Sequence, residues 1–255
     1  MNLHVLPVRT AAAAENMAQD FLLLQRYPAA DAPRFRHYEW RRPACTFGYS
    51  QKIGFVRANL PPNESFDLCR RPTGGGIVDH RNDWTYALVL PRGHALYDER
   101  AAQSYRIVHE ALAAALVALD QPAAVKMQCD QGQSCGSDLG RDSNGSRASS
   151  LPQETPIPGV CFQRAELYDV VNTATGAKIA GAAQKRNKHG LLFQGSIEKS
   201  AVGAVDWDDF SARFVAGLAR TLGVEAQATP WPDLDEGEVE GLVEQYASPE
   251  WVSYR

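Results

Sequence analysis

Three consecutive glycines, Gly74, Gly75 and Gly76, follow two arginines and a Pro-Thr pair in the segment RRPTGGGIVDH. Because glycine has no Cβ atom, the backbone can pass close to a ligand there, and its N–H groups can point at an anion. Arg71 adds a planar set of N–H donors that matches a carboxylate or a phosphate. The segment indicates an anion site, although its spacing equally suits a glycine-rich turn between strands. It contains neither the GxGxxG nor the GxxxxGK[ST] motif of nucleotide-binding loops.

Lys178 lies near the start of a second segment, AKIAGAAQKR, which is otherwise rich in small side chains. A lysine early in such a strand can project into the groove that Gly181 and Ala182 leave open. Its ammonium group would there hold a carboxylate, an acyl phosphate or an oxyanion that forms during acyl transfer. The alternative interpretation is an exposed lysine on a hairpin.

Cys161 precedes this strand in the segment GVCF. An accessible thiol near cationic groups has a lowered pKa, and its thiolate can form a thioester intermediate. The alternative is a buried and inert cysteine. His80 can act in acid–base chemistry or orient the glycine loop through a hydrogen bond. Cys129 and Cys135 lack the spacing of a zinc site, so we interpret them as free thiols and predict no metal.

Four segments have the apolar spacing of amphipathic helices, and these helices would support the strands that carry the candidate residues. Their apolar positions fall within residues 17–24, 105–119, 210–222 and 239–246. Gly223 follows the third segment and is a typical C-terminal helix cap. We expect each apolar stripe to face the core.

Extended segments lie between and after the first two of these helices. Large apolar side chains occupy every second position, at Trp84, Tyr86, Leu88 and Leu90, which predicts a half-buried strand. Shorter strands are expected near residues 35–40, 45–47, 67–71 and 77–80, with a hairpin over 167–182 and a strand over 191–197. This order of elements predicts an α+β fold in which helices pack on a mainly antiparallel sheet.

The composition limits the classes of function. The chain has 255 residues and a formal net charge of −4, which argues against nucleic-acid binding. No apolar run approaches the ~20 residues that span a membrane, and the N-terminus does not resemble a secretory signal. An odd number of cysteines, five, fits reduced thiols in the cytoplasm. We expect a single domain over residues 1–255, with a flexible loop at about 129–159. The alternative interpretation of this loop is a linker between two domains.

Taken in order, RRPTGGGIVDH, GVCF, GAKIAGAAQKR and LLFQGSI resemble the biotin/lipoate protein ligase and octanoyltransferase superfamily. The resemblance extends from about Leu6 to the end of the chain. It implies a fold like that of class II aminoacyl-tRNA synthetases, with a mainly antiparallel central sheet flanked by helices. It also implies that the glycine loop lines an acyl tunnel and that Lys178 contacts the reacting carbonyl. Arg71 and His80 match the arginine and the histidine of the family's loop.

The resemblance leaves two activities open. One class of octanoyltransferases takes octanoate from acyl carrier protein through a cysteine thioester without a cofactor, and Cys161-Phe162 matches its Cys-Phe pair. Lipoate–protein ligases instead use ATP and Mg²⁺ to form an acyl adenylate and need no thiol. We expect the transferase, with octanoyl or lipoyl groups attached to lipoyl carrier domains of 2-oxoacid dehydrogenases or to the glycine cleavage H protein. A noncatalytic acyl-binding protein is a third hypothesis, which the presence of both Lys178 and Cys161 disfavours.

Overall fold

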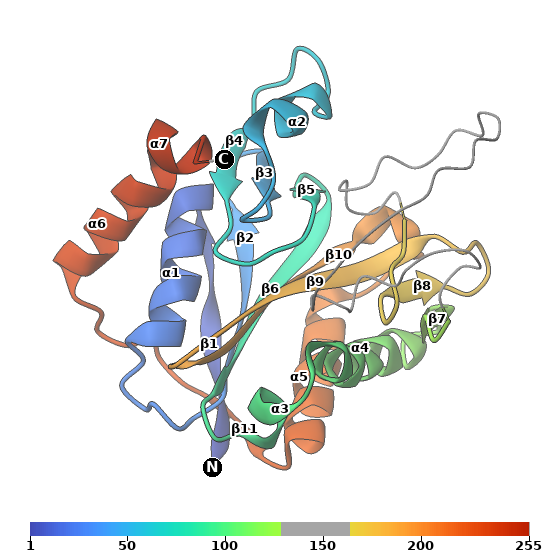
Figure 1. The fold of residues 1–255 in the computed structure, drawn as a ribbon. Coiled ribbons are helices and arrows are strands. Elements are labelled where there is room, and N and C mark those ends of the chain that lie inside the picture. Colours follow the sequence, from blue (N-terminus) through green and yellow to red (C-terminus); the bar gives the residue numbers. More distant parts are fainter. Residues whose placement is uncertain (129–163, 255) are drawn as a thin grey trace, which may run out of the picture.

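The computed structural model describes residues 1–128 and 164–254, and its main feature is a sheet of eight strands (Figure 1). The strands follow the order β11-β1-β2-β6-β10-β9-β8-β7. Their bounds are β1 Asn2–Ala11, β2 Arg34–Trp40, β6 Asp83–Pro91, β7 Ala123–Val125, β8 Val170–Asn172, β9 Lys178–Asn187, β10 Gly190–Glu198 and β11 Glu225–Ala228.

The strand pairs of this sheet are mostly antiparallel. Only β1 pairs in parallel, with β2 on one side and β11 on the other, and the pairs from β2 to β7 are antiparallel. The long β9–β10 hairpin turns at His189, whose backbone N–H donates to the side chain of Asn187 over 2.8 Å. The predicted α+β class with a mainly antiparallel sheet is confirmed.

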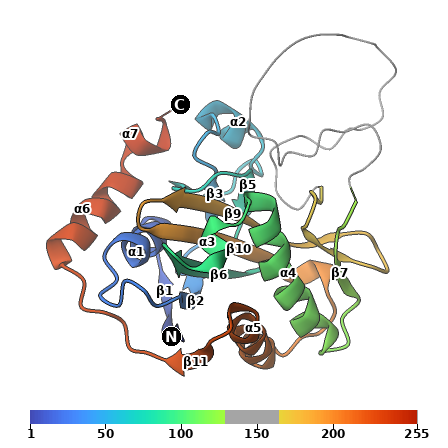
Figure 2. The same cartoon turned by 60° about the horizontal axis from the view of Figure 1, so that its bottom comes forward.

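Helices cover both faces of the sheet (Figures 1 and 2). Helices α1 (Ala13–Gln25) and α6 (Glu236–Ala247) lie on one face, and α4 (Ala101–Val117) and α5 (Trp207–Leu222) lie on the other. The four predicted helices are therefore confirmed. Helix α5 shows why its sequence forms a helix, because Asp206 caps its first turn and Gly223 ends it with φ of 68°.

Strand β6 was expected to be half-buried, and that expectation is wrong. All its residues from Trp84 to Pro91 are buried. Since helices pack on both faces at this central position, the strand has no solvent-facing side. The apolar alternation therefore predicted the strand correctly but not the burial of both its faces.

A smaller sheet lies beside the large one and carries the glycine-rich segment. Its order is β4-β3-β5, and the short helices α2 and α7 lie next to it (Figure 1). The bounds of these elements are β3 Ala44–Phe47, β4 Asp67–Arg70, β5 Ile77–Asp79, α2 Ile53–Ala58 and α7 Pro249–Val252. The glycine-rich segment connects β4 to β5, as expected of a loop between two strands.

The sequence analysis missed several elements. Strand β1 was not expected, because its second half, from Pro7 to Thr10, is exposed and has no apolar alternation. Strand β11 is fully exposed, and β7 has three residues, so neither has an apolar pattern to detect. The helix α3 (Ala95–Asp98) and the 3-10 turn Lys199–Ala201 are single turns that were also missed.

Within the described residues, no helix is long and apolar enough to cross a membrane. The loop expected at about 129–159, together with Cys129 and Cys135, lies outside the part of the chain that the structure describes.

Arg70, the first arginine of the glycine-rich segment, fastens the C-terminal helix to the small sheet. Its buried guanidinium donates to the carbonyl oxygens of Trp251 and Val252 in α7 over 3.0 and 2.9 Å. It also donates to the carbonyls of Tyr49 and Gln51 over 2.6 and 2.7 Å. The last turn of the chain and the loop after β3 are thus held by one side chain.

Replacing Arg70 with methionine is expected to lower the free energy of unfolding by about 3 kcal/mol, because buried carbonyls lose their donors. Urea unfolding measures this change, and hydrogen exchange should show faster opening of α7. Arg57→Met, at an exposed position of α2, is the matched control. Equal stability of the two variants would contradict the structural role of Arg70.

Candidate functional site

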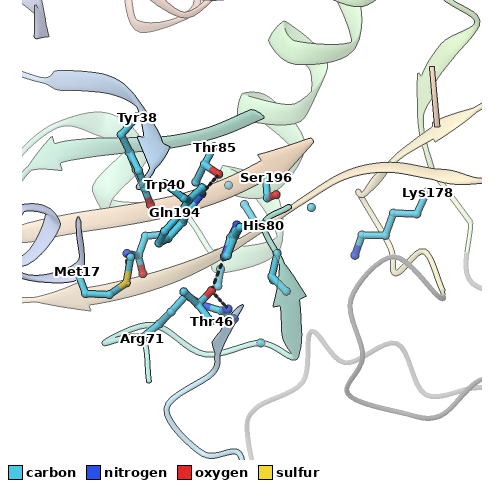
Figure 3. Close-up of a pocket in the computed structure, with 16 residues that line it drawn as sticks. Met17, Tyr38, Trp40, Thr46, Arg71, His80, Thr85, Lys178, Gln194 and Ser196 are labelled. Atoms are coloured by element: carbon cyan, nitrogen blue, oxygen red, sulfur yellow. Dashed lines mark hydrogen bonds between the residues drawn. The ribbon is translucent and has the colours of Figure 1, made fainter. Parts of the chain in front are cut away.

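A cavity lies between the glycine-rich loop and strands β6, β9 and β10 (Figure 3). Its empty volume is about 500 Å³, counting the part that is open to solvent. Six of the predicted site residues contribute to its wall. They are Arg71, Gly75, His80, Lys178, Gly181 and Ala182.

The floor of the cavity is formed by small residues on paired strands. In the β9–β10 ladder Gly181 lies opposite Ser196, and Ala183 lies opposite Gln194. The small residues Gly181, Ala183 and Ser196 leave room above the sheet for a ligand, and Gln194 lies in the cavity wall. Met17 and Val78 add apolar side chains to the wall, so the cavity suits an apolar chain with a polar end.

Arg71 holds the shape of the glycine-rich loop. One Nη2 atom donates to the carbonyl oxygens of Gly74 and Gly76, each over 2.9 Å, and Nη1 donates to Thr46 Oγ1 over 2.8 Å. Gly75 between them has φ of 89°, a conformation that favours glycine. The contact of Arg71 with a ligand anion stays a prediction, and in the structure its Nη2 donors hold the loop.

Gly48 allows the loop to pack against the end of β3. A Cβ atom at this position would lie 2.0 Å from the carbonyl oxygen of Gly75. The backbone N–H of Gly48 donates to the carbonyl of Gly76, and that of Tyr49 donates to the carbonyl of Thr73. The close approach of two backbones therefore depends on glycine on both sides.

A buried polar network anchors the other side of the loop. Thr73 donates to Gln194 Oε1 over 2.7 Å, and Gln194 Nε2 donates to Asp20 Oδ2 over 2.7 Å. Asp20 is also paired with Arg36 over 2.7 Å, and both of these side chains are fully buried. The network fixes the loop relative to α1, which carries Asp20.

His80 lies in the cavity wall between two hydrogen-bond partners. Its Nε2 atom is 2.7 Å from Thr46 Oγ1, and its Nδ1 atom is 2.6 Å from Asp83 Oδ2. The imidazole ring stacks on Trp40 with ring centres 4.0 Å apart. The expectation that His80 itself bonds the glycine loop is therefore wrong, since the link to the loop runs through Thr46 and Arg71.

Lys178 is buried, so its interpretation as an exposed hairpin lysine is excluded. Its Nζ atom forms an ion pair with Asp169 Oδ2 over 2.7 Å, and about a tenth or less of each side chain is exposed. Figure 3 shows Lys178 at one end of the labelled residues and Met17 at the other. A cation held at one end of a largely apolar cavity is suited to the polar end of an acyl ligand.

Gly181 makes room for this ion pair. A Cβ atom on Gly181 would lie 2.7 Å from both Cε and Nζ of Lys178 and 3.0 Å from Asp169 Oδ1. Any larger residue would push the lysine away from the floor of the cavity. The placement of Lys178 in the cavity therefore depends on a glycine three residues later in the same strand.

The other basic residues near Lys178 do not join it. Lys185 lies 5.8 Å from the ring centre of Tyr49, and Arg186 donates to the carbonyl of Glu99 over 2.7 Å. Lys188 is exposed near the hairpin turn. These residues are spread along β9 and its turn, and they do not form one anion site with Lys178.

His109 is a buried histidine near the Lys178–Asp169 pair. Its Nδ1 donates to the carbonyl of Tyr168 over 2.6 Å, and within the described residues its Nε2 has no hydrogen-bond partner. Burial lowers the pKa of His109, with Lys178 acting in the same direction and Asp169 opposing it. The neutral imidazole is therefore the form that the fold accommodates.

We expect His109 to lower the free energy of unfolding at acidic pH. The unfolded chain binds a proton here as the pH falls through about 6.5, whereas the folded chain, with its lowered pKa, binds it only at lower pH. The free energy of unfolding is therefore unaffected by His109 above a pH of about 6.5. Below this pH it falls by up to about 1.4 kcal/mol per pH unit, until the folded chain also binds the proton.

Urea unfolding at pH 7.5 and 5.5 tests this expectation, and His109→Gln should show a smaller difference between the two values. His37 and His94 also have pKa values lowered by burial, so some pH dependence should remain in the variant. An unchanged difference would contradict the role assigned to His109.

Cys161 lies outside the described residues, so its predicted role stays a prediction. Several residues that shape the site were missed by the sequence analysis, namely Thr46, Gly48, Asp83, Asp169 and Ser196. Only Asp169 had a signal, since it is a carboxylate just before the strand paired with β9. Ser196 lies within LLFQGSI and Asp83 lies three residues after RRPTGGGIVDH, but both resemble ordinary strand residues, and Thr46 and Gly48 lie outside the motifs.

Known proteins resemble this chain in sequence and in fold. The family model "Lipoyl protein ligase A/B catalytic domain" matches residues 12–201. Octanoyltransferase LipM of Bacillus cereus is 29% identical over 186 residues, and this match covers 72% of the chain but only 60% of the relative's length. Octanoyltransferase LipM of Symbiobacterium thermophilum is 26% identical over 275 residues, and this match covers 93% of this chain and 93% of the relative.

Among solved structures, a bi-partite lipoate protein ligase from Thermoplasma acidophilum has a TM-score of 0.68. It is 19% identical and is matched over 98% of its length and 100% of this chain. This similarity shows that the two share a fold. Because the family model covers most of the chain, including the glycine-rich loop and Lys178, this protein belongs to the lipoyl protein ligase A/B catalytic-domain family.

Proposed function

We propose that this protein transfers an octanoyl group from acyl carrier protein to a lysine of a lipoyl carrier domain. The observation that carries the proposal is its similarity to an octanoyltransferase along 93% of both chains. The cavity supports it, because an apolar pocket with a buried lysine at one end suits an acyl chain and its carbonyl. Octanoyl transfer of this kind is a reaction of the cytoplasm, where we expect the protein to act.

The proposed first step uses Cys161 as nucleophile. Its thiolate attacks the carbonyl carbon of the donor thioester, a new C–S bond forms, the C–S bond to the carrier breaks, and the carrier leaves as a thiolate that takes up a proton from solvent. One thioester replaces another, so the exchange requires no ATP. The Cys161 thiolate would need cationic groups nearby, and both Lys178 and Arg71 lie in the described part of the cavity wall.

In the second step the neutral amine of the acceptor lysine attacks the acyl-enzyme. The C–N bond of the amide forms, the C–S bond breaks, and Cys161 leaves as thiolate while the amine loses a proton. Lys178 stabilises the negative charge on the carbonyl oxygen in both steps, which is typically worth about 3–4 kcal/mol. Asp169 keeps the Lys178 ammonium in place between turnovers.

The acceptor in this proposal is the lipoyl domain of a 2-oxoacid dehydrogenase or the glycine cleavage H protein. The structural relative from Thermoplasma acidophilum is described together with its E2 lipoyl domain, which supports an acceptor of this kind. A lipoate–protein ligase that uses ATP and Mg²⁺ has the same fold. The two activities differ in the acyl donor, which is an acyl carrier protein thioester for the transferase and a free acid for the ligase.

The acyl-enzyme provides the test. The protein is incubated with octanoyl-acyl carrier protein alone and examined by intact mass and peptide mapping. We expect one octanoyl group on Cys161 that neutral hydroxylamine removes, as a thioester requires, and none on Cys161→Ala. Cys69→Ala is the control, because the Cys69 thiol is fully buried and burial raises its pKa. An unmodified Cys161 under conditions of active transfer would overturn the thioester route.

A further inference from the structure

Asp83, at the start of β6, is a buried carboxylate that has no place in the reaction described above. Its Oδ2 atom accepts hydrogen bonds from His80 Nδ1 over 2.6 Å, from Thr85 Oγ1 over 2.8 Å and from Ser196 Oγ. Among the described residues its Oδ1 atom has no partner. His80, Thr85 and Ser196 all contribute to the cavity wall, so one carboxylate joins three of its residues.

The hydrogen bonds that reach Asp83 through His80 have a fixed direction. A guanidinium can only donate, so Arg71 Nη1 donates to Thr46 Oγ1, and the Thr46 hydroxyl proton remains available for His80 Nε2. An ionised carboxylate can only accept, so the proton at the other end lies on His80 Nδ1. The chain therefore runs from Arg71 through Thr46 and His80 to Asp83.

A second chain has the same direction. The indole N–H of Trp40 donates to Thr85 Oγ1 over 3.0 Å, and the Thr85 hydroxyl donates to Asp83. Trp40 and Thr85 both line the cavity. The donors of both chains thus end on Asp83 Oδ2, and an ionised carboxylate is the stronger acceptor for them.

The environment of Asp83 favours that ionised form. Burial alone would raise its pKa, but the hydrogen bonds that the carboxylate accepts from His80, Ser196 and Thr85 oppose burial, and the pKa of Asp83 is lowered. An isolated buried carboxylate would be costly, whereas one with three donors is stable.

We propose that Asp83 is a positioning residue that holds neutral His80 in the Nδ1–H tautomer and so orients the cavity wall from Trp40 to Arg71. Since Arg71 also holds the carbonyls of Gly74 and Gly76, the orientation extends to the glycine-rich loop. Asp83 acts through these neighbours and is not itself among the described residues that line this cavity. Its effect should fall on binding of the acyl chain more than on chemistry.

The tautomer is measured directly in protein labelled with ¹⁵N-histidine, at a pH where His80 is neutral, with His80→Gln assigning its signals. We expect a protonated Nδ1 and an unprotonated Nε2 for His80. In Asp83→Asn an Nε2–H population should appear, because an amide can donate to Nδ1 and no longer requires a proton there. Ser196→Ala should keep the original tautomer, since it removes a donor to Asp83 and leaves the His80 contact intact.

Transfer kinetics provide a second measurement, and this one rests on the proposed function. For Asp83→Asn we expect KM for the acyl donor to rise about tenfold with kcat within about threefold of the original, as for a loss of uniform binding. Thr46→Val, which interrupts the chain on the far side of His80, should raise KM similarly while Nδ1 keeps its proton. If the protein transfers no octanoyl group at all, the proposed function fails while the tautomer measurement still stands.

Three results would overturn the proposal. The first is the finding that neutral His80 carries its proton on Nε2 in the unsubstituted protein. The second is an Asp83→Asn variant with the original tautomer and the original KM. The third is a loss of kcat in Asp83→Asn with KM unchanged, which would make Asp83 part of the chemistry or of general stability. If Asp83→Asn does not fold, the spectrum of the original protein and the Thr46→Val kinetics decide.

Discussion

Lys178→Met is expected to reduce octanoyl transfer by about 10²–10³-fold, because it removes the cation that stabilises the developing oxyanion. The side chain is buried in the cavity wall, and its contact with Asp169 holds its Nζ atom in one place. Methionine has a similar length and no charge, so the shape of the cavity should change little. The rate of transfer to an apo lipoyl domain, followed by intact mass, measures this effect.

The same substitution leaves Asp169 as a buried charge without Lys178, which is expected to cost about 3–5 kcal/mol of stability. The double variant Lys178→Met/Asp169→Asn separates the two effects, since it removes both charges. We expect it to be more stable than Lys178→Met and equally inactive. Lys188→Met, at an exposed position of the same hairpin, is the matched control. Activity of Lys178→Met within a few-fold of the original would contradict the role of Lys178.

Gly48→Ala is expected to lower the free energy of unfolding by about 3 kcal/mol and to abolish most of the activity. The added Cβ atom would lie 2.0 Å from the carbonyl oxygen of Gly75, and neither group is the flexible end of a side chain. The glycine-rich loop must therefore move away from β3. That movement would break the backbone hydrogen bond from Gly48 to Gly76.

Gly54→Ala provides the control for this prediction, because it makes the same change in the neighbouring helix α2, where nothing lies within 4 Å of the added atom. Its stability should be unchanged or slightly higher, since alanine favours a helix. Urea unfolding of both variants and their transfer rates make the comparison. Equal stability of Gly48→Ala and Gly54→Ala would show that the loop does not depend on this close approach.

Apolar periodicity predicted the large elements of the fold well. The repeated spacing of Phe210, Phe214 and Leu218 predicts α5, and Gly223 ends this helix with the positive φ expected of a cap. Strand β1 was not predicted because half of it is exposed without an apolar alternation and because its parallel partners are separate strands later in the chain. A parallel pairing of this kind has no local sequence signal.

The candidate site was predicted in part. The motifs identified residues that the fold brings together, such as Arg71 from the small sheet and Lys178 from β9. The partners of these residues could not be predicted, because Thr46, Asp83 and Asp169 acquire their roles only when separate strands meet. For the same reason, the sequence indicated a ligand contact for Arg71, which stays a prediction, but not that its Nη2 donors hold the loop.

The most direct test of the account is transfer from octanoyl-acyl carrier protein to an apo lipoyl domain without ATP, followed by intact mass of the acceptor. The account predicts that the acceptor gains one octanoyl group, and that Cys161→Ala and Lys178→Met each abolish this gain. No transfer until octanoate, ATP and Mg²⁺ are supplied, with Cys161→Ala as active as the original protein, would contradict it and make the protein a ligase.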